Sequence, residues 1–116
     1  MTSLKEEILE ATIELRSSLD ATDFRDLIAA FLSDAPDKLE TMSLSVNSRD
    51  KNEFKRCAHA LKGSIGLFGL DELRMICVDL ENSDLNAETE KKFQLLREQL
   101  NLVFAALQEI DRELEE

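Results

Sequence analysis

Apolar residues recur every three or four positions along most of the chain, and charged or polar side chains fill the positions between them. This spacing matches the turn of an α-helix, and no segment shows the sustained two-residue alternation of a half-buried strand. The pattern predicts five helices, which cover approximately residues 4–19, 24–47, 51–67, 71–81 and 87–114.

Capping residues and helix breakers indicate where these helices begin and end. Ser3 is expected to cap the first helix and Thr22 or Asp23 the second, because their side-chain oxygens can accept hydrogen bonds from free backbone N–H groups. At Pro36 the second helix is expected to kink, or to restart with proline in its first turn. Gly69 is expected to end the third helix in a left-handed conformation.

The number of helices and the length of the chain predict the fold class. We expect an all-α protein, an antiparallel four-helix bundle with an additional N-terminal helix, in which residues 1–116 form a single domain. A chain of 116 residues is long enough for one hydrophobic core and short for two. Dimerisation through the last helix is a weaker alternative, because the bundle already needs its apolar face. We therefore expect a monomer.

The net charge of −11 argues against several classes of partner and site. Nucleic acids and acidic lipids both require a basic surface, and no apolar run approaches the roughly 20 residues that span a bilayer. The acidic start of the chain does not resemble a signal peptide, so we expect a cytoplasmic protein that binds neither nucleic acid nor membranes. Cys57 and Cys77, with one histidine, do not provide the four ligands of a zinc site. We expect two buried, reduced thiols, no metal and no cofactor.

One short segment reverses the acidic balance of the chain. Between Arg49 and Lys62 five basic residues stand against two acidic ones, a net charge of +3, and the remainder of the chain sums to −14. This basic segment surrounds His59, the only histidine. A run of charge usually forms only a solvated helix face, but this one coincides with a candidate reactive residue.

His59, Lys62 and Gly63 share one face of the third predicted helix. Residues three or four positions apart lie on the same side of a helix, and this side is opposite the apolar stripe that includes Leu61 and Ile65. The imidazole should therefore face solvent. A histidine packed in the core is the alternative interpretation.

Gly63 and Gly66 need an explanation, because a glycine inside a helix costs roughly 1 kcal/mol relative to alanine. Two interpretations stay open: the missing side chains clear the approach to His59, or they permit close helix–helix packing. An exposed imidazole beside a lysine suits a nucleophile that accepts a phosphoryl group, since the neutral ring is available near neutral pH and the lysine can balance phosphoryl charge. No nucleotide loop or catalytic triad is evident, so turnover would come from partners.

The segment His59-Ala60-Leu61-Lys62-Gly63-Ser64 resembles the signature of histidine-containing phosphotransfer (HPt) domains of multistep phosphorelays. The resemblance extends to Leu80-Glu81 on the next helix and to the upstream segment 31–36, and it covers about residues 23–110. Ile65 is a small departure, because the family usually has Ser or Ala at that position.

The resemblance implies a role for each residue of the motif. His59 would be phosphorylated on Nε2 and would exchange the phosphoryl group with an aspartate of a receiver domain, in a response regulator or a hybrid kinase. Lys62 would neutralise the phosphoryl charge, and Gly63 would admit the receiver's active-site loops. Glu81 matches a position that often hydrogen-bonds the other imidazole nitrogen, with a solvated surface glutamate as the alternative. Ser64 is a motif position too, although local packing or backbone hydrogen bonding explains it equally well.

Docking on a receiver domain would also explain the basic segment. Lys55 and Arg56 would complement the receiver's carboxylate cluster, Gly66 would keep the approach clear, and unburied apolar residues of the segment 24–32 would contribute docking energy. Such a protein is a phosphotransfer intermediate without kinase or phosphatase activity of its own, and an upstream sensor or hybrid histidine kinase is implied. The alternative is a non-catalytic adaptor or inhibitor that docks on receiver or kinase domains.

Overall fold

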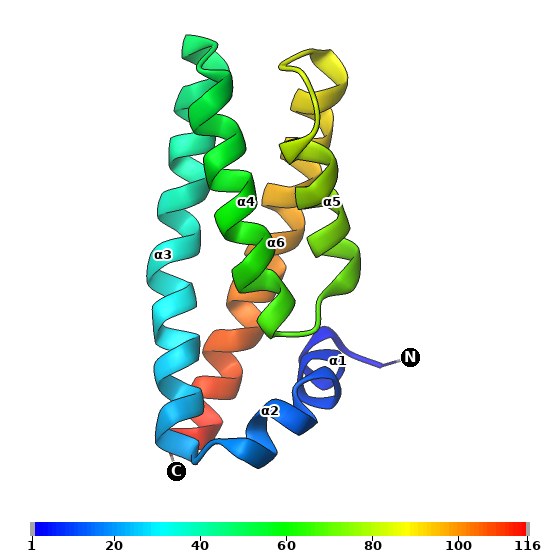
Figure 1. Cartoon of the computed structure of the whole chain (residues 1–116). Helices are drawn as coiled ribbons and strands as arrows, with labels where there is room; N and C mark the ends of the chain where they lie inside the picture. The colour runs from blue at the N-terminus through cyan, green and yellow to red at the C-terminus, as the bar shows by residue number, and fades with distance from the viewer. Residues whose placement is uncertain (1, 116) are drawn as a thin grey trace.

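The computed structural model describes residues 2–115, which fold into six α-helices and no strand (Figure 1). The helices are α1 (Leu4–Ala11), α2 (Ile13–Ser18), α3 (Ala21–Ser48), α4 (Lys51–Leu67), α5 (Asp71–Glu81) and α6 (Ala87–Glu115). The four helices α3–α6 run side by side with alternating direction, and both α4 and α6 pack against α3 and α5. The predicted all-α fold is confirmed, and four of its helices lie as an antiparallel bundle.

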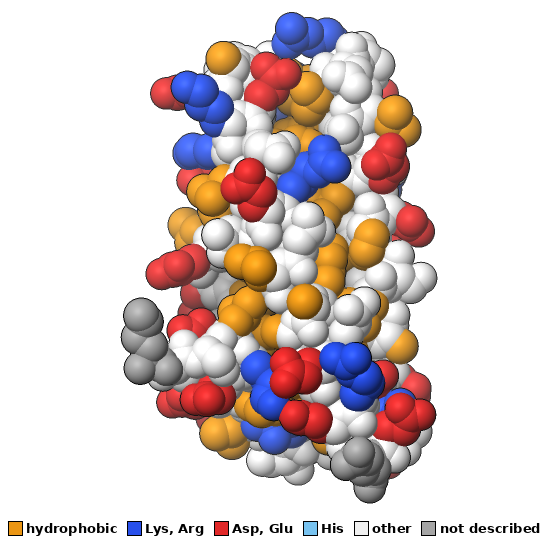
Figure 2. Space-filling view, turned by 180° about the vertical axis from the view of Figure 1, so that it is seen from behind, with side chains coloured by type: hydrophobic (Ala, Val, Ile, Leu, Met, Phe, Trp, Pro, Cys, Tyr) orange, Lys and Arg blue, Asp and Glu red, His pale blue; other side chains and the backbone are white. Residues whose placement is uncertain are grey.

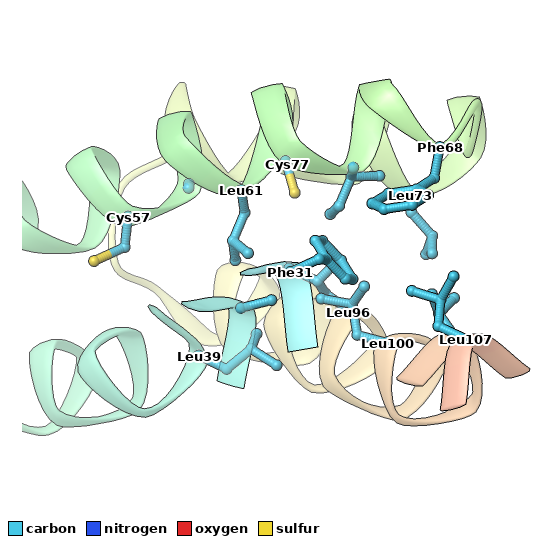
Figure 3. Packing of buried hydrophobic residues seen from close by; sticks show 14 of the residues in the cluster. Phe31, Leu39, Cys57, Leu61, Phe68, Leu73, Cys77, Leu96, Leu100 and Leu107 are labelled. Atoms are coloured by element: carbon cyan, nitrogen blue, oxygen red, sulfur yellow. The ribbon is translucent and has the colours of Figure 1, made fainter. Parts of the chain in front are cut away.

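The core of the bundle consists of apolar side chains that α3–α6 turn toward one another (Figure 3). The ring centroid of Phe31 lies 5.1 Å from that of Phe68 and 5.7 Å from that of Phe104. Toward the other end of α4, Phe54 and Phe93 meet edge to face with centroids 5.7 Å apart. The two free cysteines are buried in the same core. The outward faces of the bundle helices are therefore left for polar and functional side chains.

The N-terminal region differs from the predicted single helix over residues 4–19, because it divides into α1 and α2 at Thr12. Thr12 is fully buried, and its hydroxyl donates a 2.7 Å hydrogen bond to the carbonyl of Ile8. The Arg16 guanidinium donates to the carbonyl of Leu9 at the same junction. The Leu9 carbonyl is thus satisfied by a side-chain donor where the helix is interrupted, whereas the Ile8 carbonyl also accepts a hydrogen bond from the backbone N–H of Thr12. α1 packs against α6 at one end of the bundle.

The second predicted segment is also different, because α3 is one continuous helix of 28 residues that passes through Pro36. The expectation of a restart there is wrong. Proline removes one backbone hydrogen bond, but Ala35 beside it is buried, so packing of the inner face stabilises the helix across this point. The N-cap is Asp20, whose carboxylate accepts a 2.8 Å hydrogen bond from the N–H of Asp23; the expected caps, Thr22 and Asp23, lie inside the helix.

The turn after α4 aligns α5 with α4. Gly69 has a φ of 69°, the left-handed conformation expected from the sequence, and α5 then returns along α4 from Asp71 (Figure 1). The last residue of α5 is Glu81, which reaches the outward face in the middle of α4 at His59. The length of α5 therefore sets which of its side chains meets that face.

Candidate functional site

His59 lies in the middle of α4 and faces solvent. Its side chain is 67 % exposed, whereas the neighbouring Ala58 and Leu61 are buried in the core. The orientation predicted from the helical period is correct, and the alternative of a core histidine is wrong. The imidazole is therefore accessible to a large partner.

Glu81 bridges His59 and Lys62. One of its carboxylate oxygens lies 2.6 Å from Nδ1 of His59, and the other accepts a 2.9 Å hydrogen bond from Nζ of Lys62. The contacts with Lys62 and then His59 hold the pKa of Glu81 below its usual value of 4.5, so the carboxylate is ionised at neutral pH. Its side chain is only 24 % exposed, and the alternative of a freely solvated glutamate does not describe it.

The ionised Glu81 determines the tautomer of the neutral imidazole. A carboxylate without a proton can only accept hydrogen bonds, so Nδ1 of His59 must be the donor in this contact. The lone pair of the ring then belongs to Nε2, on the side of the ring away from Nδ1. Nε2 of His59 is therefore an exposed nucleophile. The Glu81 carboxylate that contacts the imidazole also binds the ammonium group of Lys62.

The two helix-interior glycines differ in their surroundings. A Cβ added at Gly63 would meet no atom within 4 Å, so this glycine is not needed for helix–helix packing. At Gly66 an added Cβ would lie 3.3 Å from Cδ of Arg74, which belongs to a flexible side chain. The packing interpretation is therefore wrong for Gly63, and the open space beside His59 supports the interpretation of a clear approach.

Ser64 does not join the group around His59. Its hydroxyl donates a 3.3 Å hydrogen bond to the carbonyl of Ala60, one turn earlier in α4. This contact matches the local backbone hydrogen bonding that the sequence left open as its explanation.

Most of the basic segment is paired with carboxylates. Arg56 donates two hydrogen bonds to Glu53, one of them 3.0 Å long from Nε, and Lys51 pairs with Asp84. Among the described residues no carboxylate lies within 4 Å of the Lys55 ammonium. Much of the positive charge counted in the sequence is thus compensated locally. Arg49 donates to the carbonyl of Leu85 and also lacks a carboxylate partner among the described residues, but Lys55, one helical turn before His59, is the unpaired cation nearer to the site.

The structure adds an apolar residue near the site that sequence reasoning missed. Leu67 at the end of α4 is 54 % exposed, whereas Leu27 and Leu32 of the segment 24–32 are half-buried. Because eight positions are slightly more than two helical turns, Leu67 lies within about a quarter turn of the His59 face. The spacing between Leu67 and His59 was the available signal in the sequence, but only the structure shows that this leucine is exposed.

Two further findings concern the described part of the chain. Within residues 2–115 no group of three or more His, Cys, Asp or Glu side chains could hold a metal ion. No helix in that range is long and apolar enough to cross a membrane.

Comparison with known families agrees with this site. The family model of the Hpt domain matches residues 26–115, close to the range of about 23–110 expected from the sequence. Searches of curated protein sequences and of solved structures gave no match. The chain therefore belongs to the Hpt domain family and has a histidine phosphotransfer role in phosphorelays, in which such domains interact with receiver domains and histidine kinases.

Proposed function

We propose that His59 accepts a phosphoryl group on Nε2 and exchanges it with the aspartate of a receiver domain. The contact between Nδ1 and the ionised Glu81 is the observation that most directly supports this, because it leaves Nε2 of an exposed ring as the nucleophile. The upstream donor is a sensor or hybrid histidine kinase, and the receivers belong to response regulators or hybrid kinases. The protein itself acts as an intermediate, without kinase or phosphatase activity of its own.

Each group of the site has a defined part in the transfer. The Nε2 lone pair of His59 forms a bond to the phosphorus of the receiver's aspartyl phosphate, the phosphorus–oxygen bond breaks, and its electron pair leaves with the aspartate. The proton on Nδ1 stays in place, so the phosphorylated ring is cationic, and Glu81 stabilises that charge. The Lys62 ammonium offsets negative charge on the transferred phosphoryl oxygens. Donation to a second receiver is the reverse of these steps.

The partner docks on the face of α4 that surrounds the imidazole. Gly63 and Gly66 present no side chains there, which allows the receiver's loops to approach the ring. Lys55 attracts the carboxylates of the receiver site and favours the correct orientation, while Leu67 contributes apolar contact area.

The chemistry of the transferred label tests this proposal. Radioactive phosphate supplied by a phosphorylated receiver domain should appear on the protein as an acid-labile, base-stable label, and proteolysis should place it on the peptide that contains His59. A docking adaptor or inhibitor would bind the same receiver and stay unlabelled. Label that survives acid would indicate a hydroxyl ester and would overturn the proposal.

Replacing Glu81 with Ala should slow phosphoryl uptake about tenfold, which is the lower end of the range for metal-ligating histidines that lose the side chain orienting their ring. Without the acceptor at Nδ1, the neutral ring of His59 would populate the tautomer that is protonated on Nε2 and cannot attack. Nitrogen-15 NMR of the imidazole, recorded where the ring is neutral, should show the proton moving from Nδ1 to Nε2.

Glu81→Gln is the matched control for this variant. Its amide oxygen can still accept from Nδ1 of His59, so the tautomer should persist, and uptake should fall less than in Glu81→Ala. The positioning role would be refuted by a Glu81→Ala protein that keeps both the parental tautomer and the parental uptake rate.

Replacing Gly63 with Leu should reduce transfer without reducing stability. The new side chain would enter open space beside His59, so it would strain nothing inside the bundle, and leucine favours a helix over glycine by roughly 0.8 kcal/mol. If the leucine keeps the receiver's phosphoryl group farther from the imidazole than the reacting distance, phosphoryl transfer should be roughly 10- to 100-fold slower. Rapid-quench transfer kinetics and urea unfolding measure the two effects. Gly63→Ala should give an intermediate rate, and parental kinetics in Gly63→Leu would argue against a close approach at this point.

A further inference from the structure

We propose that the groove between α1, the start of α5 and α6 binds a basic amphipathic helix of a partner protein. The groove has a volume of about 530 Å³. It is built from the N-terminal half of α5, whereas the phosphotransfer site uses Glu81 at the other end of that helix. The groove therefore includes none of His59, Lys62 and Glu81, although its Gly69 and Leu70 follow closely on Leu67 of the receiver-docking face.

The floor of the groove is apolar and accessible. Leu4, Leu70 and Ile76 are half-buried, and Leu95 is 45 % exposed. The side of the molecule formed by α6, seen from behind in Figure 2, carries apolar side chains along its middle, with carboxylates and several lysine or arginine side chains around them. Apolar surface of this kind is typical of interaction sites.

The shape of the groove favours a helical occupant. Its α6 wall consists of Leu95, Gln99 and Val103, spaced four residues apart, and its α5 wall includes Leu73 and Ile76, three apart. Two helix faces that border an apolar channel accept a third helix, which inserts side chains spaced three or four positions apart.

The rim of the groove specifies the charge of the occupant. Glu7, Asp71 and Glu72 line it and are exposed, and no lysine or arginine is among the lining residues. None of the three carboxylates forms an ion pair with a described residue. Lysine or arginine side chains on the flanks of an apolar helix face would meet these free carboxylates, which favours association and the correct orientation.

A second copy of the same chain is the less suitable occupant. A symmetric dimer through this groove would bring two acidic rims together in a protein whose net charge is −11. Like charges placed opposite each other at an interface oppose association. The charge pattern therefore selects a basic partner over self-association.

Binding of a designed peptide to the full chain tests the proposal. The probe is a fluorescent amphipathic peptide with leucines three and four residues apart on one face and lysines on both flanks. A scrambled peptide of the same composition controls for attraction to an acidic protein. The amphipathic peptide should bind at least about tenfold more tightly than the scrambled one, because only it can fill the apolar floor. Amide NMR shifts should concentrate on the residues that line the groove.

Two substitutions of exposed leucines complete the test. Leu95→Lys should weaken peptide binding about tenfold or more, since it removes apolar floor and adds a repelling charge. Leu44→Lys is the matched control, because Leu44 is exposed on α3 and does not line the groove, so binding should stay within about twofold of the parent. Equal binding of both peptides, or equal binding by both variants, would overturn the proposal. Concentration-dependent dimerisation of the free protein that Leu95→Lys abolishes would assign the groove to self-association and would also overturn it.

Discussion

Replacing His59 with Gln is expected to abolish phosphoryl uptake from a phosphorylated receiver domain. The amide of glutamine has no nucleophilic lone pair equivalent to Nε2, so no covalent intermediate can form. The uptake rate should fall to the background of the assay, because His59 is the only histidine in the chain.

The structure indicates that this loss would reflect chemistry and not misfolding. The His59 side chain is mostly exposed, and a glutamine amide could still donate a hydrogen bond to Glu81. The circular dichroism spectrum and the urea midpoint should therefore match those of the parent. Asn52→Gln, an exposed change on the same face of α4 two turns earlier, should leave uptake near the parental rate. If His59→Gln takes up as much label as the parent, the proposed acceptor is incorrect.

Replacing Gly69 with Ala should destabilise the fold by at least about 2 kcal/mol. The φ of 69° is unfavourable for any residue with a Cβ, and an added Cβ would lie 2.7 Å from Cβ of Ala11 and 3.2 Å from its carbonyl oxygen. Gly69 therefore both shapes the turn between α4 and α5 and allows the end of α1 to pack against that turn. Urea unfolding, followed by far-ultraviolet circular dichroism, measures the change in the free energy of unfolding.

The same substitution at Gly63 is the matched control and should have the opposite sign. Gly63 lies inside α4 with nothing within 4 Å of an added Cβ, so Gly63→Ala should stabilise the protein by about 0.5–1 kcal/mol. Combining Gly69→Ala with Ala11→Gly should restore only that part of the lost free energy of unfolding that is due to the contact between the two Cβ atoms. A double-mutant cycle measures this part separately. A Gly69→Ala protein as stable as the parent would show that the turn does not need glycine.

The 3.6-residue period of the helix was sufficient to predict much of the fold and part of the site. It predicted the bounds of α4 closely and the outward direction of His59, and the glycine at position 69 predicted the left-handed conformation that follows the helix. These properties depend on residues within a few positions of one another, since a helix repeats every 3.6 residues and glycine alone adopts positive φ without steric cost. A single sequence encodes such local properties directly.

Several features of the helices depend on contacts that the period does not describe. The first helix divides at Thr12, which is buried and whose hydroxyl donates to the carbonyl of Ile8, and α3 continues through Pro36 with buried residues on its inner face. Local signals favoured a single helix in the first case and a kink or a restart in the second. Tertiary packing outweighed them, because burial of an apolar face contributes more to helix stability than intrinsic propensity does.

The sequence by itself determined that an exposed histidine, a lysine and a glycine share one face of a helix in an acidic bundle. Only the tertiary structure decided that Glu81 contacts both His59 and Lys62, that Glu53 and Asp84 neutralise neighbouring basic residues, and that an acidic groove stays open beside α1. His59 and Glu81 are 22 positions apart, and their meeting depends on the length of α5 and the angle of the turn at Gly69. The period of a helix places side chains around its own axis, whereas the identity of the helix that faces them depends on how the bundle closes.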